Sequence, residues 1–341
     1  MGGPLTPAAP CSTAHVRIDH YSAVHLAAET ARTLAARCGL PGALPDRAAV
    51  VASELAGNLA KHAVSGSLYV QPMPLGGGLE VLAADRGPGM PEIRRCLADG
   101  YSTTGSLGAG LGAVDRIAAY FAIRTEIPGG TLACARIAPP DRADAAREAV
   151  GAVCVPAERE TANGDGYAVL DTGGSRTVFV VDGLGHGEPA AEAAQAALRA
   201  FARAADQPLP DVLRTVHRAL RHTRGAAAGL LRHHPDRVEF AAVGNIRCVA
   251  LTAHEVRRRL AGQPGIVGLN LPAPQVRCLP REPGLSVLLH SDGIDPAWTR
   301  STSPFLLRLP APLLAAALAD RHRLIRDDAT VVVAGPHQGL T

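Results

Sequence analysis

The chain has 341 residues, of which 47% are hydrophobic and 19% charged, and this composition excludes a disordered protein. The net charge is only +3 and no basic stripe with interleaved aromatic residues is visible, so we expect no nucleic-acid partner. The seven cysteines lack metal-binding spacing, the N-terminus lacks the pattern of a signal peptide, and no apolar run approaches the ~20 residues of a membrane span. The sequence therefore predicts a cytoplasmic protein without a membrane partner.

The first half of the chain predicts an α/β domain over residues 15–138, after a flexible N-terminus at 1–14. A Gly39–Pro41 break separates two helical stretches, and three glycines at 76–78 suggest a hairpin turn. The expected elements are strands at 15–21, 67–73, 79–85, 121–126 and 130–137, and helices near 22–38, 46–64 and 111–120.

Residues 139–149 are charged, begin with prolines and lack an apolar face, so they read as a linker between two domains. A second domain is predicted over 150–336. Its expected strands lie near 151–155, 166–171, 176–182, 226–233, 237–243, 246–251, 285–291 and 329–335, and its expected helices at 187–205 and 209–222.

Polar residues share one face of the predicted helix at 46–64. Glu54, Asn58 and Lys61 follow one another at four and three positions, and Lys61 is the only lysine among 34 basic residues. A carboxylate, an amide oxygen and an ammonium suit a magnesium–phosphate group, although an isolated helix with this pattern would more often show a solvated face.

Two glycine-rich segments follow this helix. Asp85 ends a strand and precedes Gly87 and Gly89, so its carboxylate can accept from an exocyclic amine while the backbone approaches a planar base. Gly108, Gly110 and Gly112 precede a helix, where backbone N–H groups form a cradle for anions. The three segments together favour a nucleotide site over three unrelated turns.

These motifs resemble the N box and the two G boxes of the GHKL ATPase superfamily, and most of all its anti-sigma-factor serine/threonine kinases of the stressosome type (RsbT-like). The resemblance covers roughly residues 15–138 and implies a GHKL (Bergerat) α/β sandwich that binds ATP with Mg²⁺. It implies that Asn58 binds Mg²⁺ and that Asp85 contacts adenine. It also implies that the glycines form the ATP lid and that Glu54 is the catalytic base.

Carboxylates occur at strand ends throughout the second half. Asp165, Asp182, Asp292 and the pair Asp327–Asp328 each adjoin a predicted strand. Gathered carboxylates repel one another unless cations neutralise them, and an all-aspartate set suits Mg²⁺ or Mn²⁺. Each aspartate alone would be an ordinary turn residue, but four together favour a centre with two metal ions that activates water for phosphoester hydrolysis.

The order of these aspartates resembles the metal-dependent protein phosphatases of the 2C type, in their SpoIIE-like branch (RsbX-like), over about 150–335. The resemblance implies an αββα sandwich in which Asp182 bridges both metals and Gly183 offers its carbonyl. Asp165 would complete one metal site, with Asp292 and Asp327 completing the other. Asp328 remains an alternative to Asp327, and His186 reads either as a proton donor or as a turn residue.

The two resemblances predict an α+β protein of two domains that phosphorylates and dephosphorylates serine or threonine on STAS-domain partners in a sigma-factor or stressosome pathway. A sigma factor or a downstream phosphatase is a further expected partner. Alternatives are a phosphatase gated by ATP binding without kinase turnover, an ATP-binding module that sequesters its partner, and a scaffold with degenerate sites.

Overall fold

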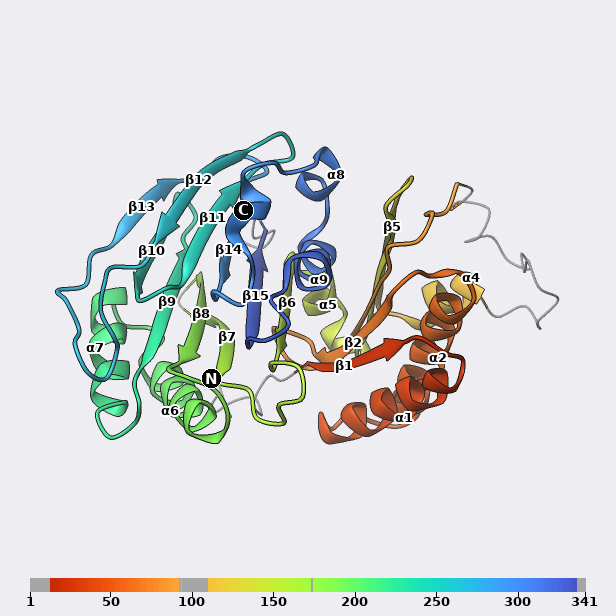
Figure 1. Ribbon diagram of the computed structural model, residues 1–341, viewed down its shortest axis with the longest axis horizontal. Helices are drawn as coiled ribbons and strands as arrows, with labels where there is room; N and C mark the ends of the chain where they lie inside the picture. The colour runs from red at the N-terminus through yellow and green to blue at the C-terminus, as the bar shows by residue number, and fades with distance from the viewer. Residues whose placement is uncertain (1–12, 92, 94–109, 173, 336–341) are drawn as a thin grey trace. The chain divides into compact units, whose positions relative to one another are not determined.

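In the computed structural model, which describes residues 13–91, 93, 110–172 and 174–335, the chain divides between Glu148 and Ala149 into two units (Figure 1). Residues 1–12 of the expected flexible N-terminus therefore lie outside the described part. Among the described residues, no helix combines the length and the apolar character that a membrane crossing requires.

The N-terminal unit contains one antiparallel sheet with the strand order β1-β2-β3-β5-β4. The strands are β1 (Ala14–Ile18), β2 (Gly66–Pro72), β3 (Leu79–Ala84), β4 (Tyr120–Glu126) and β5 (Gly130–Ile137), and the helices are α1 (Ser22–Arg37), α2 (Leu44–His62) and α4 (Gly110–Ile117). These elements match the expected ones, except that α4 ends earlier because the chain enters β4 at Tyr120.

Small apolar residues on α1 build the helical layer of this unit. Ala27, Ala31 and Ala35 recur at four-residue spacing and are fully buried, which lets α1 pack closely along α2. The two helices share one core cluster with the strands, and Figure 1 shows them side by side. The opposite edge of α2 is left to carry polar residues.

The segment expected to be a linker is folded in this structure. It forms a short 3-10 helix at Pro140–Arg142 and the helix α5 (Ala143–Arg147). The buried Arg136 of β5 donates from Nη1 to the carbonyl oxygens of Ala146 and Glu148, each at 2.9 Å. These bonds tie the segment to the N-terminal sheet, so most of it belongs to that unit.

The C-terminal unit contains two five-stranded sheets, ordered β13-β10-β9-β8-β7 and β12-β11-β14-β15-β6. The strands are β6 (Val150–Val155), β7 (Asp165–Thr172), β8 (Ser175–Gly183), β9 (Ala226–His233), β10 (Arg237–Val243), β11 (Arg247–Leu251), β12 (Val256–Ala261), β13 (Arg277–Pro280), β14 (Ser286–His290) and β15 (Ala329–Ala334). The helices are α6 (Glu188–Ala204), α7 (Leu209–Ala219), α8 (Pro304–Leu307) and α9 (Ala311–His322), with a 3-10 turn at Pro296–Thr299.

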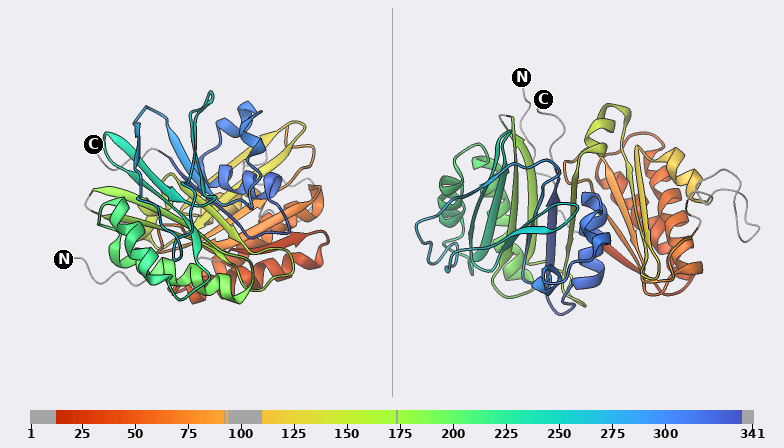
Figure 2. Two further views of the ribbon diagram at one scale, coloured as in Figure 1. Left: turned by 60° about the vertical axis from the view of Figure 1, so that its left-hand side comes forward. Right: turned by 90° about the horizontal axis from the view of Figure 1, so that it is seen from above.

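Helices cover the outer face of each sheet in this unit. The helices α6 and α7 share a core with the first sheet, whereas α9 packs on β6 and β15 of the second. The strands β6 and β15 also contact β7 across the sandwich. Figure 2 shows the green helices and the blue α9 on opposite sides of the strands. The expected αββα arrangement is therefore confirmed, although α9, β12 and β13 were not predicted.

Candidate functional sites

The polar face of α2 is the first candidate site. Glu54 and Asn58 are half-buried and Lys61 is exposed. Burial raises the pKa of the Glu54 carboxyl, and the charge of Lys61 partly offsets this rise. The Nδ2 atom of Asn58 is buried and finds no hydrogen-bond partner among the described residues. A buried amide of this kind is uncommon in a face that serves packing alone.

The loop after β3 lies against the end of α2. Asp85 is buried and its Oδ1 accepts a hydrogen bond of 2.6 Å from the backbone N–H of Gly87. The N–H of Arg86 donates to the carbonyl of Val64, just beyond α2. A Cβ at Gly87 would come within 3.2 Å of the His62 carbonyl oxygen, so only glycine fits this approach without displacement. The structure thus joins the predicted Asp85 segment to the helix that carries Glu54.

The glycine-rich segment before α4 is described only in part. Gly108 lies outside the described residues, whereas Gly110 and Gly112 form the first turn of α4. Gly89 adopts a positive φ of 80° in the preceding loop. The helix α4, which begins with two of the predicted glycines, packs against α2.

The second candidate site lies in the C-terminal unit, where strands from both sheets end in aspartates. Asp165 begins β7 and pairs in register with Asp182 near the end of β8. Asp292 follows β14, and Asp327 lies just before β15. The structure therefore brings together aspartates that lie up to 162 positions apart along the chain, counted from Asp165 to Asp327.

The carboxylates of this cluster raise one another's pKa. Burial, followed by the charge of Asp292, raises the pKa of Asp182 to about 7. Burial and then the charge of Asp182 raise the pKa of Asp165 well above its usual range. Loss of hydration and the charge of Asp292 also raise the pKa of Asp327. The cluster thus concentrates negative charge.

Two neutral side chains that the sequence analysis did not identify hold this cluster. Asn245, in the turn between β10 and β11, donates from Nδ2 to Asp292 Oδ2 at 2.7 Å and to Asp182 Oδ2 at 3.2 Å. Ser291 donates from Oγ to Asp165 Oδ2 at 2.6 Å. The other oxygen of Asp165, Oδ1, is buried and has no protein partner among the described residues. This oxygen remains free to take a ligand.

Asp328 plays a different part from its neighbour Asp327. Its two carboxylate oxygens accept hydrogen bonds from the backbone N–H groups of Ala157 (2.7 Å) and Gly164 (2.8 Å). These bonds fix the loop that leads into β7, and they occupy the oxygens that a metal would need. The geometry therefore favours Asp327 over Asp328 as the residue that faces the cluster.

Gly183 and His186 follow Asp182 on the chain. A Cβ at Gly183 would lie 2.4 Å from the carbonyl oxygen of Ala190, so the first turn of α6 requires glycine there. The side chain of His186 is 79% exposed, with Nδ1 3.5 Å from Glu160 Oε1. This exposure fits a turn residue on the rim better than a buried proton donor.

In the part of the chain that the structure describes, no three Asp, Glu, His or Cys side chains stand so close that they could share one ion. The carboxylates meet in pairs, and the Nδ2 atom of Asn245 contacts two of them. Pairs still fit magnesium, because Mg²⁺ usually takes one or two carboxylates and keeps several water molecules. The all-oxygen donor set, the free Oδ1 atom of Asp165 and the raised pKa values suit hard divalent cations.

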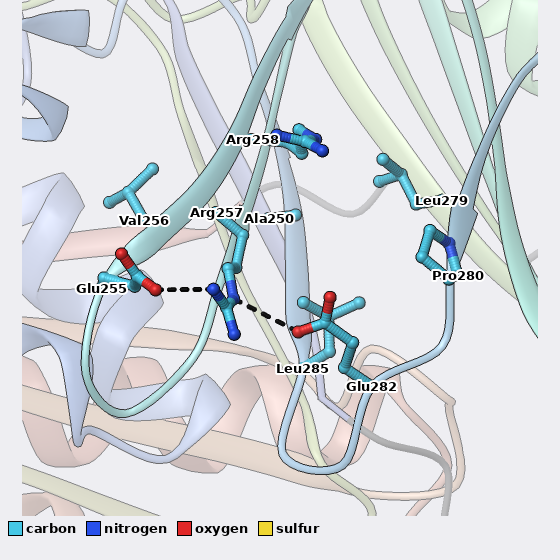
Figure 3. Close-up of a pocket in the computed structure, with 9 residues that line it drawn as sticks. All are labelled: Ala250, Glu255, Val256, Arg257, Arg258, Leu279, Pro280, Glu282 and Leu285. Carbon is cyan, nitrogen blue, oxygen red and sulfur yellow. Dashed lines mark hydrogen bonds and ion pairs between the residues drawn. The ribbon is translucent and has the colours of Figure 1, made fainter.

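A separate cavity of about 300 Å³ opens at the edge strands β12 and β13 (Figure 3). Arg257 crosses it, with Nη1 2.6 Å from Glu255 Oε1 and Nε 3.2 Å from Glu282 Oε2. None of the predicted site residues lines this cavity. This cavity is therefore separate from both candidate sites.

Comparisons with known proteins agree with two distinct regions. The family model of Stage II sporulation protein E (SpoIIE) matches residues 172–336. The serine/threonine-protein kinase RsbT of Bacillus subtilis (strain 168) is 36% identical over 118 residues, which cover 34% of this chain and 89% of RsbT.

Two solved structures are similar to part of the chain. A chain from a study of the bacterial stressosome, described as a modular system adapted to control secondary messenger signalling, is 33% identical. The match covers 54% of this chain and 97% of that one, with a TM-score of 0.50. RsbX in complex with magnesium is more distant, at 18% identity and a TM-score of 0.47, over 54% of this chain and 92% of RsbX.

The raised carboxyl pKa values predict how the metal-free protein responds to pH. Asp182 has a pKa of about 7 in the folded state against an ordinary 3.8, so the folded state holds its proton more tightly. The contribution of Asp182 to the stability of the folded state is therefore full below about pH 3.8 and is lost as the pH rises through about 7. In EDTA, the melting temperature of the aspartate-bearing unit should fall by on the order of 5 °C between pH 5.5 and 8.

Differential scanning calorimetry of the full chain measures this effect. Asp182→Asn should flatten the fall, whereas Asp206→Asn, at an exposed turn outside the cluster, should leave it unchanged. If the melting temperature fell equally in the wild-type protein and in Asp182→Asn, the raised pKa of Asp182 would not be the cause.

Proposed function

The chain belongs to the family of the RsbT serine/threonine kinases and also carries a SpoIIE-type phosphatase domain, and from this we propose that it is a bifunctional regulator of protein phosphorylation. The N-terminal unit transfers phosphate from ATP to serine or threonine of a STAS-domain partner in the cytoplasm. The C-terminal unit removes phosphate from such a partner. The partner in turn controls a sigma factor or another stressosome output.

One observation supports the phosphatase half above all others: aspartates at strand ends of both sheets raise one another's pKa. Two Mn²⁺ or Mg²⁺ ions would neutralise the cluster, and when bound they supply Lewis-acid activation of water and of the phosphoryl group. We assign Asp182 to both ions and Asp165 to one of them. Asp292 and Asp327 would hold the other, and the backbone carbonyl of Gly183 would be a further ligand.

The protein residues around the cluster orient these ligands. Ser291 fixes one oxygen of Asp165, so that its free Oδ1 is presented to the site. Asn245 holds Asp182 and Asp292 within reach of each other. Such neighbours keep ligand carboxylates in place and are important for metal affinity in other proteins.

The kinase half is supported by the α2 face and the loop joined to it. Asn58 would hold the Mg²⁺ that accompanies ATP, and Lys61 would contact phosphate. Asp85 would accept from the adenine amine beside Gly87 and Gly89, while Gly108, Gly110 and Gly112 would enclose the phosphates. Glu54 would take the proton of the incoming hydroxyl, and its raised pKa makes it a better base than an ordinary glutamate.

Removing one carboxylate tests the phosphatase assignment. Asp182→Asn should lower the Mn²⁺-dependent hydrolysis of a phosphoserine peptide by roughly 100-fold or more and weaken Mn²⁺ binding, because the residue serves both ions. Activity is followed by phosphate release and binding by isothermal titration calorimetry. Asp206→Asn is the matched control. Full hydrolysis by Asp182→Asn would overturn the assignment.

Two variants of α2 separate kinase turnover from ATP sensing. Glu54→Gln should keep ATP affinity within a few-fold and lose phosphoryl transfer by roughly 100-fold or more, because a general base contributes that much. Asn58→Ala should lose both, because the Mg²⁺ contact is removed. Filter binding of ATP and transfer of labelled phosphate to a STAS protein provide the two readouts. Unchanged transfer by Glu54→Gln would leave the glutamate without the proposed role.

A further inference from the structure

The turn before β9 lies beside the loop that follows the Asp182 strand. The strands β8 and β9 pair Gly183 with Ala226, and beyond this pair the N–H of Leu184 donates to the carbonyl of Gly225 at 3.0 Å. Continuing this register places Arg224 opposite Gly185. Arg224 therefore lies opposite the third residue after Asp182, beyond the same ends of β8 and β9.

The backbone of this turn is fixed by its own side chains. Thr223 Oγ1 donates to the carbonyl of Leu220 at 2.8 Å and accepts from the N–H of Gly225 at 3.0 Å. Gly225 has a φ of 81°, and a Cβ there would approach Ile266 Cγ2 to 2.7 Å. The position of Arg224 is thus determined by the fold rather than by contacts of its side chain.

The guanidinium of Arg224 extends over Gly185. A Cβ on residue 185 would lie 3.0 Å from Arg224 Nη1. Because this residue is glycine, the guanidinium can occupy that space. Arg224 is exposed, and its side chain makes no hydrogen bond or ion pair with any residue that the structure describes. Two other exposed arginines of this unit are instead paired, Arg214 with Asp211 and Arg257 with Glu255.

We propose that Arg224 binds the phosphoryl group of the phosphatase substrate, an inference that rests on the proposed hydrolysis of phosphoserine or phosphothreonine. Two divalent ions would only neutralise the four aspartates, so a phosphate dianion gains from a further fixed positive charge beside them. The planar fork of a guanidinium donates to two phosphate oxygens at once, and a fixed backbone places that fork in advance. On the loop that follows Asp182, His186 lies 3.5 Å from Glu160, whereas the guanidinium of Arg224 lies beside Gly185 of the same loop.

Arg224→Ala and Arg224→Lys in the full chain test this inference. For Mn²⁺-dependent hydrolysis of a phosphothreonine peptide, Arg224→Ala should raise KM roughly 10- to 100-fold and change kcat only a few-fold, as expected for a charged hydrogen-bonded contact. Arg224→Lys should restore part of the loss. The inhibition constant of inorganic phosphate should rise by the same factor as KM. Arg221→Ala, an exposed arginine of the preceding turn, serves as control.

Calorimetry separates this inference from the proposed function. The Mn²⁺ dissociation constant should stay the same in Arg224→Ala, while the affinity of the Mn²⁺-loaded protein for inorganic phosphate should fall. The phosphate titration requires no turnover, so it decides the role of Arg224 even if the wild-type protein hydrolyses no phosphopeptide. Unchanged phosphate binding, or a loss of Mn²⁺ binding as large as the loss of phosphate binding, would overturn the inference.

Discussion

Mutual repulsion among aspartates at one end of the sandwich is the constraint on which the C-terminal unit depends. The fold brings Asp165, Asp182, Asp292 and Asp327 from separate strand ends to one end of the sandwich, where three of them lose hydration as well. When these carboxyls are ionised, their repulsion lowers the stability of the folded state. A role in function would explain why the fold retains them. Divalent cations convert the same arrangement from a cost into a binding site.

Neutral groups around the cluster limit that cost without removing the charge. Asn245 and Ser291 donate hydrogen bonds to three of the carboxylates and add no cation that would compete with a metal. Asp328 is satisfied by two backbone N–H groups and secures the approach to β7. In the N-terminal unit, α2 has both a structural and a proposed functional side. Its apolar side completes the core, and its polar side carries Glu54 and Asn58.

Much of this arrangement could be predicted from the sequence, because strand-end aspartates and the helical spacing of Glu54, Asn58 and Lys61 are local patterns. The helix α9 was missed since its run of alanine and leucine is buried almost all round and shows no polar face. The edge strand β12 was missed because consecutive exposed arginines hide its alternation. Asn245 and Ser291 carry no local signal, as their role arises only from pairing with distant residues. The choice between Asp327 and Asp328 likewise required the contacts of Ala157 and Gly164.

The most direct measurement removes the proposed phosphatase activity so that kinase activity can be detected. The Asp292→Asn protein, which lacks one of the proposed metal ligands, is incubated with ATP, Mg²⁺ and STAS-domain proteins, and intact-mass spectrometry follows the STAS proteins. A bifunctional kinase–phosphatase predicts an added phosphoryl group that disappears when wild-type protein and Mn²⁺ are supplied. Absence of that group, despite ATP binding by the variant, would contradict kinase turnover and leave a phosphatase that only senses ATP.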